Sequence, residues 1–145
     1  MRGLIQRVSA ASVRVEGELV GEIGVGTLLL LGVHKGDTEE QALKLLEKVL
    51  AYRIFPDASG RMNRSLADIS GGLLVVSQFT LAAETKKGLR PGFESAEQPA
   101  RAEALYEFFL QEARARHPYI ASGRFGADMK VQLLNDGPVT FLLEM

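Results

Sequence analysis

The sequence predicts an α+β fold: a single compact domain in which a strand-rich, barrel-like sheet carries two amphipathic helices. The length of 145 residues is typical of one domain with one hydrophobic core. Most apolar residues occur in short runs or alternate with polar ones, and only two segments repeat them at helical spacing. No repeat, low-complexity tract or linker-like segment divides the chain, so one domain is expected over residues 1–145.

The first predicted elements are strands. Residues 13–20 alternate apolar and polar side chains around Gly17, which predicts a hairpin. Thr27 to Val33 is a short continuous apolar run, typical of a strand that is covered on both faces.

The first helix is expected to begin after Thr38, whose hydroxyl can accept from a free amide of the first turn while Gln41 reaches back in a capping box. The apolar residues that follow predict one buried stripe: Ala42, Leu45, Leu46, Val49 and Leu50. Residues 53–55 then look like a strand that enters a turn at residues 56–60.

A central strand is predicted over residues 73–81, which are rich in apolar and β-branched side chains. Residues 82–98 show little periodicity and are interpreted as a long functional loop. Its basic cluster, Lys86, Lys87 and Arg90, is either a solvated face or a phosphate-binding surface, and the sequence leaves both open.

The second helix is expected to begin at Pro99, a favoured first helical residue, and to end before His117-Pro118. Its buried stripe comprises Ala102, Leu105, Tyr106, Phe109 and Ala113. Two late strands, residues 129–134 and 139–143, are joined by Asn135-Asp136-Gly137-Pro138. An ordinary hairpin turn is the simplest interpretation of that tetrapeptide, and the isomer of the bond before Pro138 stays open.

The composition excludes several kinds of site. There are no cysteines, so a disulfide framework, a thiolate zinc site and a cysteine nucleophile are all excluded, and no other spacing suggests a metal ligand set. Seventeen basic and eighteen acidic residues nearly cancel, which argues against a protein that coats RNA. The first residues lack a signal-peptide pattern and no apolar run could span a bilayer, so we expect a cytoplasmic protein without membrane contact.

Ser77-Gln78-Phe79-Thr80 is the strongest candidate for a site. It is either a strand edge with local hydrogen bonds or a polar patch that positions a substrate. A nucleophilic triad is hard to build, because neither of the two histidines, His34 and His117, has a sequence context that points at these hydroxyls. Both histidines are therefore expected at the surface.

At these residues the sequence resembles the D-aminoacyl-tRNA deacylase family, and the resemblance runs from end to end. Ser-Gln-Phe-Thr and Gly-Pro-Val-Thr in one chain are specific as a pair, although either alone would be weak. The matching blocks are Met1 to Val8, Met62-Asn63 with Ser65, Ser77 to Leu81, Gly123-Arg124-Phe125-Gly126 and Asn135 to Thr140.

The resemblance implies a homodimer that hydrolyses the ester of D-aminoacyl-tRNA, and of glycyl-tRNA, without a cofactor and without acting on DNA. Ser77 to Thr80 would line the pocket of their own subunit, and Met129 would line it too. The Gly137-Pro138 bond would be cis and would reach into the partner's pocket, where its carbonyls hold the α-amino group and leave no room for an L side chain. Arg7 would brace this motif.

The catalytic step has two interpretations, with Thr80 as nucleophile or with the terminal 2′-hydroxyl of the RNA assisting water. The missing base beside Thr80 favours the second, with backbone amides near Phe79 and Thr80 stabilising the oxyanion. Two other functions remain to be distinguished. A non-catalytic RNA-binding module would cleave nothing, and a serine esterase would require a Gly-x-Ser-x-Gly elbow, which does not surround Ser77.

Overall fold

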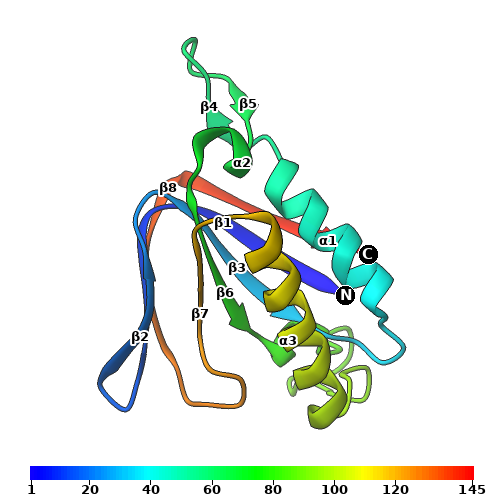
Figure 1. Cartoon of the computed structure of the whole chain (residues 1–145). Coiled ribbons are helices and arrows are strands. Elements are labelled where there is room, and N and C mark those ends of the chain that lie inside the picture. Colours follow the sequence, from blue (N-terminus) through cyan, green and yellow to red (C-terminus); the bar gives the residue numbers. More distant parts are fainter.

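The computed structural model describes all residues from Met1 to Met145. Figure 1 shows a strongly curved sheet with two long helices on one side and a small ribbon projecting beyond one end. The elements, in chain order, are β1 (Arg2–Val15), β2 (Glu18–Ile23), β3 (Gly26–Gly32), α1 (Glu39–Ala51), β4 (Phe55–Pro56), β5 (Met62–Arg64), α2 (Leu66–Ile69), β6 (Gly72–Ser77), the 3₁₀ turn η1 (Phe79–Ala82), α3 (Pro99–Arg116), β7 (Ile120–Ser122) and β8 (Lys130–Glu144).

The main sheet has the order β2-β1-β3-β6-β7, with β8 along the other side of β1. The first half of β1 pairs with β3 and its second half pairs with β2, while β8 follows both halves. The sheet curls until β2 approaches β6 and β7: a Cβ at Gly21 would lie 2.6 Å from the Ser122 carbonyl oxygen, and one at Gly72 would lie 2.7 Å from the Ile23 side chain. The expected barrel-like sheet is thus nearly closed.

Two hydrophobic clusters lie on the two faces of this sheet. The smaller one fills the inside of the curl and comprises Val8, Ala11, Val13, Leu28, Leu74 and Val76. The larger one joins the outer face to α1 and α3. Strand β3 contributes Leu28 to the first cluster and Leu29 to the second, which confirms a strand covered on both faces.

The features that depend on local sequence are confirmed. Thr38 and Gln41 form the capping box of α1, and Pro99 is the first residue of α3, which ends before His117. The first hairpin turns at Glu16 and Gly17, whose φ angles are 51° and 80°. The short helix α2, capped by Ser65, has no counterpart among the predicted elements.

The predicted strand over residues 73–81 is wrong beyond Ser77. The amide of Gln78 donates to the Leu31 carbonyl at 2.8 Å, and β3 ends one residue later, so the chain loses its pairing partner. It turns instead into η1, which packs over the space left at Gly32, where a Cβ would lie 2.8 Å from that of Leu81. Ser77 and Phe79 therefore do not share a strand face.

The predicted hairpin at Asn135–Pro138 is also wrong. β8 is one continuous strand, and β1 pairs with it both before and after this segment. The extra residues form a bulge, visible as a register change between the pairs Gln6–Thr140 and Val8–Asn135. Asn135 holds the bulge through bonds to the Val139 amide (2.8 Å) and the Thr140 hydroxyl (2.9 Å), and the Gly137–Pro138 bond is cis.

No helix of this protein combines the length and the hydropathy that crossing a bilayer requires.

Candidate functional site

A pocket of about 450 Å³ opens where β6 ends. It brings together four of the predicted site residues, Ser77, Gln78 and Phe79 from the end of β6 and Met129 from the segment before β8. The other lining residues are Val76, Glu97, Pro99, Ala102, Phe125, Gly126, Ala127, Asp128 and Val131.

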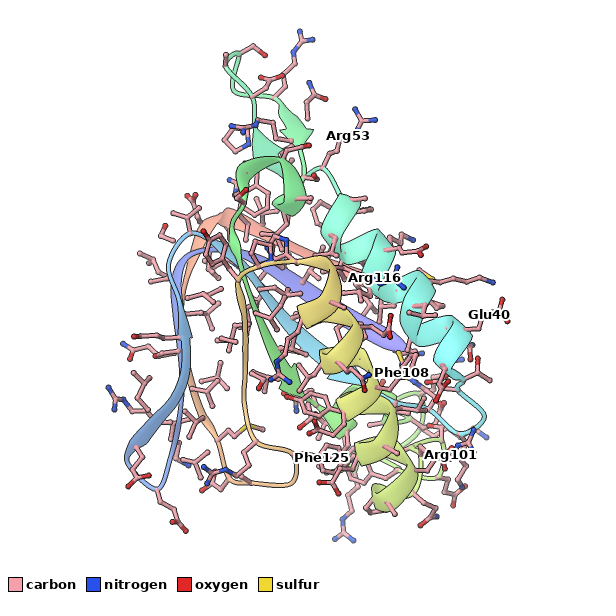
Figure 2. The ribbon with its side chains drawn as sticks, in the orientation of Figure 1. Glu40, Arg53, Arg101, Phe108, Arg116 and Phe125 are labelled. Carbon is pink, nitrogen blue, oxygen red and sulfur yellow. The ribbon has the colours of Figure 1, made fainter.

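The inner wall of the pocket includes the aromatic ring of Phe125 and the thioether of Met129. The ring of Phe125 lies 5.8 Å from that of Tyr106 on α3, and Figure 2 shows Phe125 beside this helix. The Tyr106 hydroxyl donates to the Val75 carbonyl at 3.1 Å, and burial raises the pKa of Tyr106 to about 12, so the phenol stays neutral. Met129 accepts from the Arg124 amide at 3.4 Å and fills the space beside Gly123, where a Cβ would lie 2.5 Å from its sulfur.

The rim of the pocket is formed by the first residues of η1. Phe79 is 61% exposed, and its ring lies 5.0 Å from that of Phe93. Thr80 does not line the pocket; its hydroxyl accepts from the Gln78 side-chain amide at 2.5 Å. The backbone amides of Phe79 and Thr80 begin a 3₁₀ turn and so have no carbonyl acceptor within it, which leaves two free donors just after the end of β6.

Neither histidine lines the pocket, so no imidazole is placed there as a base for these hydroxyls. His117 is buried, contrary to the surface position expected, and its Nε2 lies 2.6 Å from the Gly71 carbonyl. The Nδ1 of His34 is 4.0 Å from Asp37 and has no hydrogen-bond partner, and desolvation lowers the pKa of His34. Since imidazole is the usual activator of a serine or threonine hydroxyl, the site lacks a conventional nucleophile–base pair.

The two carboxylates that line the pocket, Glu97 and Asp128, both form ion pairs. Glu97 accepts from the backbone amide of Gln98, which lowers its pKa, and it pairs with Arg101 at 3.2 Å. Asp128 pairs with Lys130 at 3.0 Å. There is also no group of three or more histidine and acidic side chains that could hold a metal ion.

The remaining predicted residues form a second group, away from the pocket. Arg7 donates to the Asp136 carbonyl at 2.8 Å and to the Ile54 carbonyl at 2.7 Å, so it ties the bulge of β8 to the chain before β4. Gly137 and Pro138 are exposed. Three inter-strand spacings and about four residues along the sheet separate Gly137 from Ser77, a distance on the order of 15–20 Å.

Several lining residues had no role in the sequence interpretation, notably Phe125, Ala127 and Asp128. The block Gly123-Arg124-Phe125-Gly126 resembled the family but suggested no chemistry. The signal that could have found this wall is Gly126, which adopts a φ of 73° and turns the chain toward the pocket.

Comparison with known proteins covers the whole chain. The sequence profile of the D-Tyr-tRNA(Tyr) deacylase family matches residues 4–144. A D-aminoacyl-tRNA deacylase from Cellvibrio japonicus is 61% identical over 145 residues, covering 100% of this chain and 99% of the relative. One from Stutzerimonas stutzeri is 62% identical over 144 residues, covering 99% of each chain.

Solved structures share the fold. The structure named c-Myc DNA Unwinding Element Binding Protein has a TM-score of 0.96 and 40% identity, covering 100% of this chain and 99% of that one. A probable eukaryotic D-amino acid tRNA deacylase has a TM-score of 0.83 at 18% identity, covering 99% of this chain and 98% of that one, which shows the fold alone. On the profile match and the full-length identities, this chain belongs to the D-aminoacyl-tRNA deacylase family.

Proposed function

We propose that this protein hydrolyses the ester bond between a D-amino acid and the terminal adenosine of tRNA, releasing the free amino acid and the tRNA. The observation that carries the proposal is the pocket at the end of β6, which has an aromatic side chain in its wall, free backbone amides beside it and no histidine. An aminoacyl ester is already activated, so a site that positions it and stabilises an oxyanion is sufficient. Because this substrate is made for translation, the proposal includes a cytoplasmic location.

In this mechanism the amides of Phe79 and Thr80 donate to the carbonyl oxygen of the ester as negative charge develops there. Ser77 and Gln78 orient the substrate, and Met129 and Phe125 enclose it. Water attacks the carbonyl with help from the 2′-hydroxyl of the terminal ribose, which passes the proton of the water to the leaving 3′-oxygen. The RNA takes this role because no histidine lines the pocket and its two carboxylates are ion-paired.

Chiral selection is proposed to be completed by a second copy of the chain. Gly137 and Pro138 are too far from their own pocket to touch a substrate there, yet they are exposed and rigidly held by Arg7 and Asn135. The outer edge of β8 has no partner strand and exposes Leu134, Phe141 and Leu142, which supports a homodimer interface, expected to bury at least about 1,200 Å².

In the dimer, Gly137-Pro138 of one subunit forms a wall in the pocket of the other. Both enantiomers of an amino acid offer the same polar groups, so strong discrimination requires a repulsive element where the L side chain would lie. Glycine has no side chain to exclude, and glycyl-tRNA is therefore expected to be cleaved as well.

The direct test compares D-tyrosyl-tRNA, L-tyrosyl-tRNA and glycyl-tRNA with the pure protein. We expect D-tyrosyl-tRNA to be hydrolysed with a kcat/KM roughly 100-fold or more above that of the L form, the scale of steric exclusion from a rigid pocket. Glycyl-tRNA should also be hydrolysed. Cleavage of neither enantiomer would indicate a binding module, and equal cleavage of both would indicate a plain esterase; either result would disprove the proposal.

The role of Thr80 has its own test. Thr80→Ala should keep kcat within about tenfold of the unmodified protein, since the variant retains the backbone amide, whereas loss of one oxyanion donor costs roughly 10²–10³-fold. Thr80→Ser is the matched control, because it keeps a hydroxyl at the same atom. Single-turnover hydrolysis of D-tyrosyl-tRNA would measure both variants. If Thr80→Ala were inactive while Thr80→Ser and the fold were preserved, Thr80 would be the nucleophile.

A further inference from the structure

The loop between η1 and α3 carries an unpaired group of positive charges beside the pocket. Lys86, Lys87 and Arg90 are exposed, lie within five residues of one another, and form no ion pair. The protein as a whole has a formal charge of −1, so this local excess is a feature of the loop rather than of the composition. The acidic residues of the same segment, Glu84, Glu94 and Glu97, lie at its base, and Glu97 is engaged by Arg101.

The base of the loop is fixed to the rim of the pocket. Glu84 and Gly92 exchange two backbone hydrogen bonds of 2.7 and 3.0 Å, which makes the segment between them a short hairpin-like tip. The Ser95 hydroxyl donates to the Ala82 carbonyl, and the ring of Phe93 packs against that of Phe79. The segment that carries the three cations is thereby anchored at its base to residues at the pocket rim.

We infer that this loop binds the phosphates of the 3′ strand of the tRNA acceptor arm. The inference rests on the proposed function: if the ester lies in the pocket, the ribose-phosphate chain attached to it must leave through the mouth, over Phe79 and Phe93. The nearest phosphates then pass the tip of the loop, where the three unpaired cations can form ion pairs with them. Phosphate contacts of this kind position a nucleic acid without reading its sequence, which suits an enzyme that must act on many tRNAs.

The inference predicts that removal of the three charges lowers kcat/KM only for substrates that carry phosphates. In the variant Lys86→Gln/Lys87→Gln/Arg90→Gln, kcat/KM for D-tyrosyl-tRNA should fall about 10- to 100-fold at 0.1 M salt, mainly through KM. The slope of log kcat/KM against log salt concentration should become shallower by about 2, since each contact to a single strand contributes about 0.7. Hydrolysis of 3′-O-D-tyrosyl-adenosine, which has no phosphate, should stay within about twofold.

A matched variant separates this site from general charge effects. Arg14→Gln/Lys48→Gln/Arg114→Gln removes the same charge from exposed positions on β1, α1 and α3 and should leave both kcat/KM and the salt slope unchanged. The inference is overturned if the loop variant matches this control on D-tyrosyl-tRNA, or if it loses the adenosine ester and the tRNA in parallel, which would mean that the loop shapes the pocket. Failure of the proposed function is distinguishable, because the unmodified protein would then cleave neither D-substrate or would cleave L-tyrosyl-tRNA as fast as D-tyrosyl-tRNA.

Discussion

Gly137→Val should slow hydrolysis of D-tyrosyl-tRNA by about 100-fold or more without unfolding the protein. Gly137 has a φ of 140°, which L side chains rarely adopt, and a Cβ there would lie 2.7 Å from the Val139 side chain and 3.0 Å from Nη2 of Arg7. Relief of these contacts must displace the bulge that Arg7 and Asn135 hold in place. A displacement of about 1 Å in an element that positions substrate costs on the order of 10²-fold in rate.

The sharper form of this prediction is complementation between two inactive variants. Ala127→Trp places a large ring on the wall of the pocket and should block it, while leaving Gly137 and Pro138 intact. If each site combines the pocket of one subunit with Gly137-Pro138 of the other, a mixed dimer holds one site free of both substitutions. After subunit exchange, roughly a quarter of all sites should therefore be active.

Hydrolysis of D-tyrosyl-tRNA would be measured for each variant alone and for the exchanged mixture, with analytical ultracentrifugation to verify dimers. A mixture of the unmodified protein with Ala127→Trp provides the activity reference, because half of all its sites stay active whether or not the subunits exchange. Mixed dimers that stay inactive, or an unmodified protein that is fully active as a monomer at micromolar concentration, would contradict the shared site.

Gly26→Ala should cause a large loss of stability. Gly26 pairs with Gly72 across the parallel β3–β6 ladder, and a Cβ at Gly26 would lie 1.9 Å from the Gly72 carbonyl oxygen and 2.7 Å from its nitrogen. Both atoms belong to the backbone, so neither can rotate away, and the two strands must separate. We expect the free energy of unfolding to fall by about 3 kcal/mol or more, and the midpoint temperature by about 10 °C.

Gly24→Ala is the control for this substitution, because it lies two residues earlier, is exposed, and has open space around its Cβ position. Urea and thermal denaturation followed by circular dichroism would compare both variants with the unmodified protein. Equal midpoints for Gly26→Ala and Gly24→Ala would show that the close approach of β3 and β6 is not required.

The sequence by itself determined the elements whose signals are local. The capping box at Thr38 and Gln41, the helical stripes of α1 and α3 and the turn at Glu16-Gly17 each depend on residues within a few positions, and all appear as predicted. The end-to-end resemblance likewise identified the family, because the motif pair Ser-Gln-Phe-Thr and Gly-Pro-Val-Thr can be recognised in the sequence without a structure. The residues Ser77, Gln78, Phe79 and Met129 were identified in the same way and do line one pocket.

Only the tertiary structure decided where the strands end and which residues distant in sequence lie close together. β6 ends at Ser77 because its neighbour β3 ends, and Asn135–Pro138 is a bulge because β1 pairs on both sides of it, so each outcome depends on a strand distant in sequence. His117 is buried because β6 begins beside the end of α3, where the Gly71 carbonyl meets its ring. The same holds for the separation between Ser77 and Gly137: sheet order and register fix it, and these arise from pairing energies between segments that no local pattern encodes.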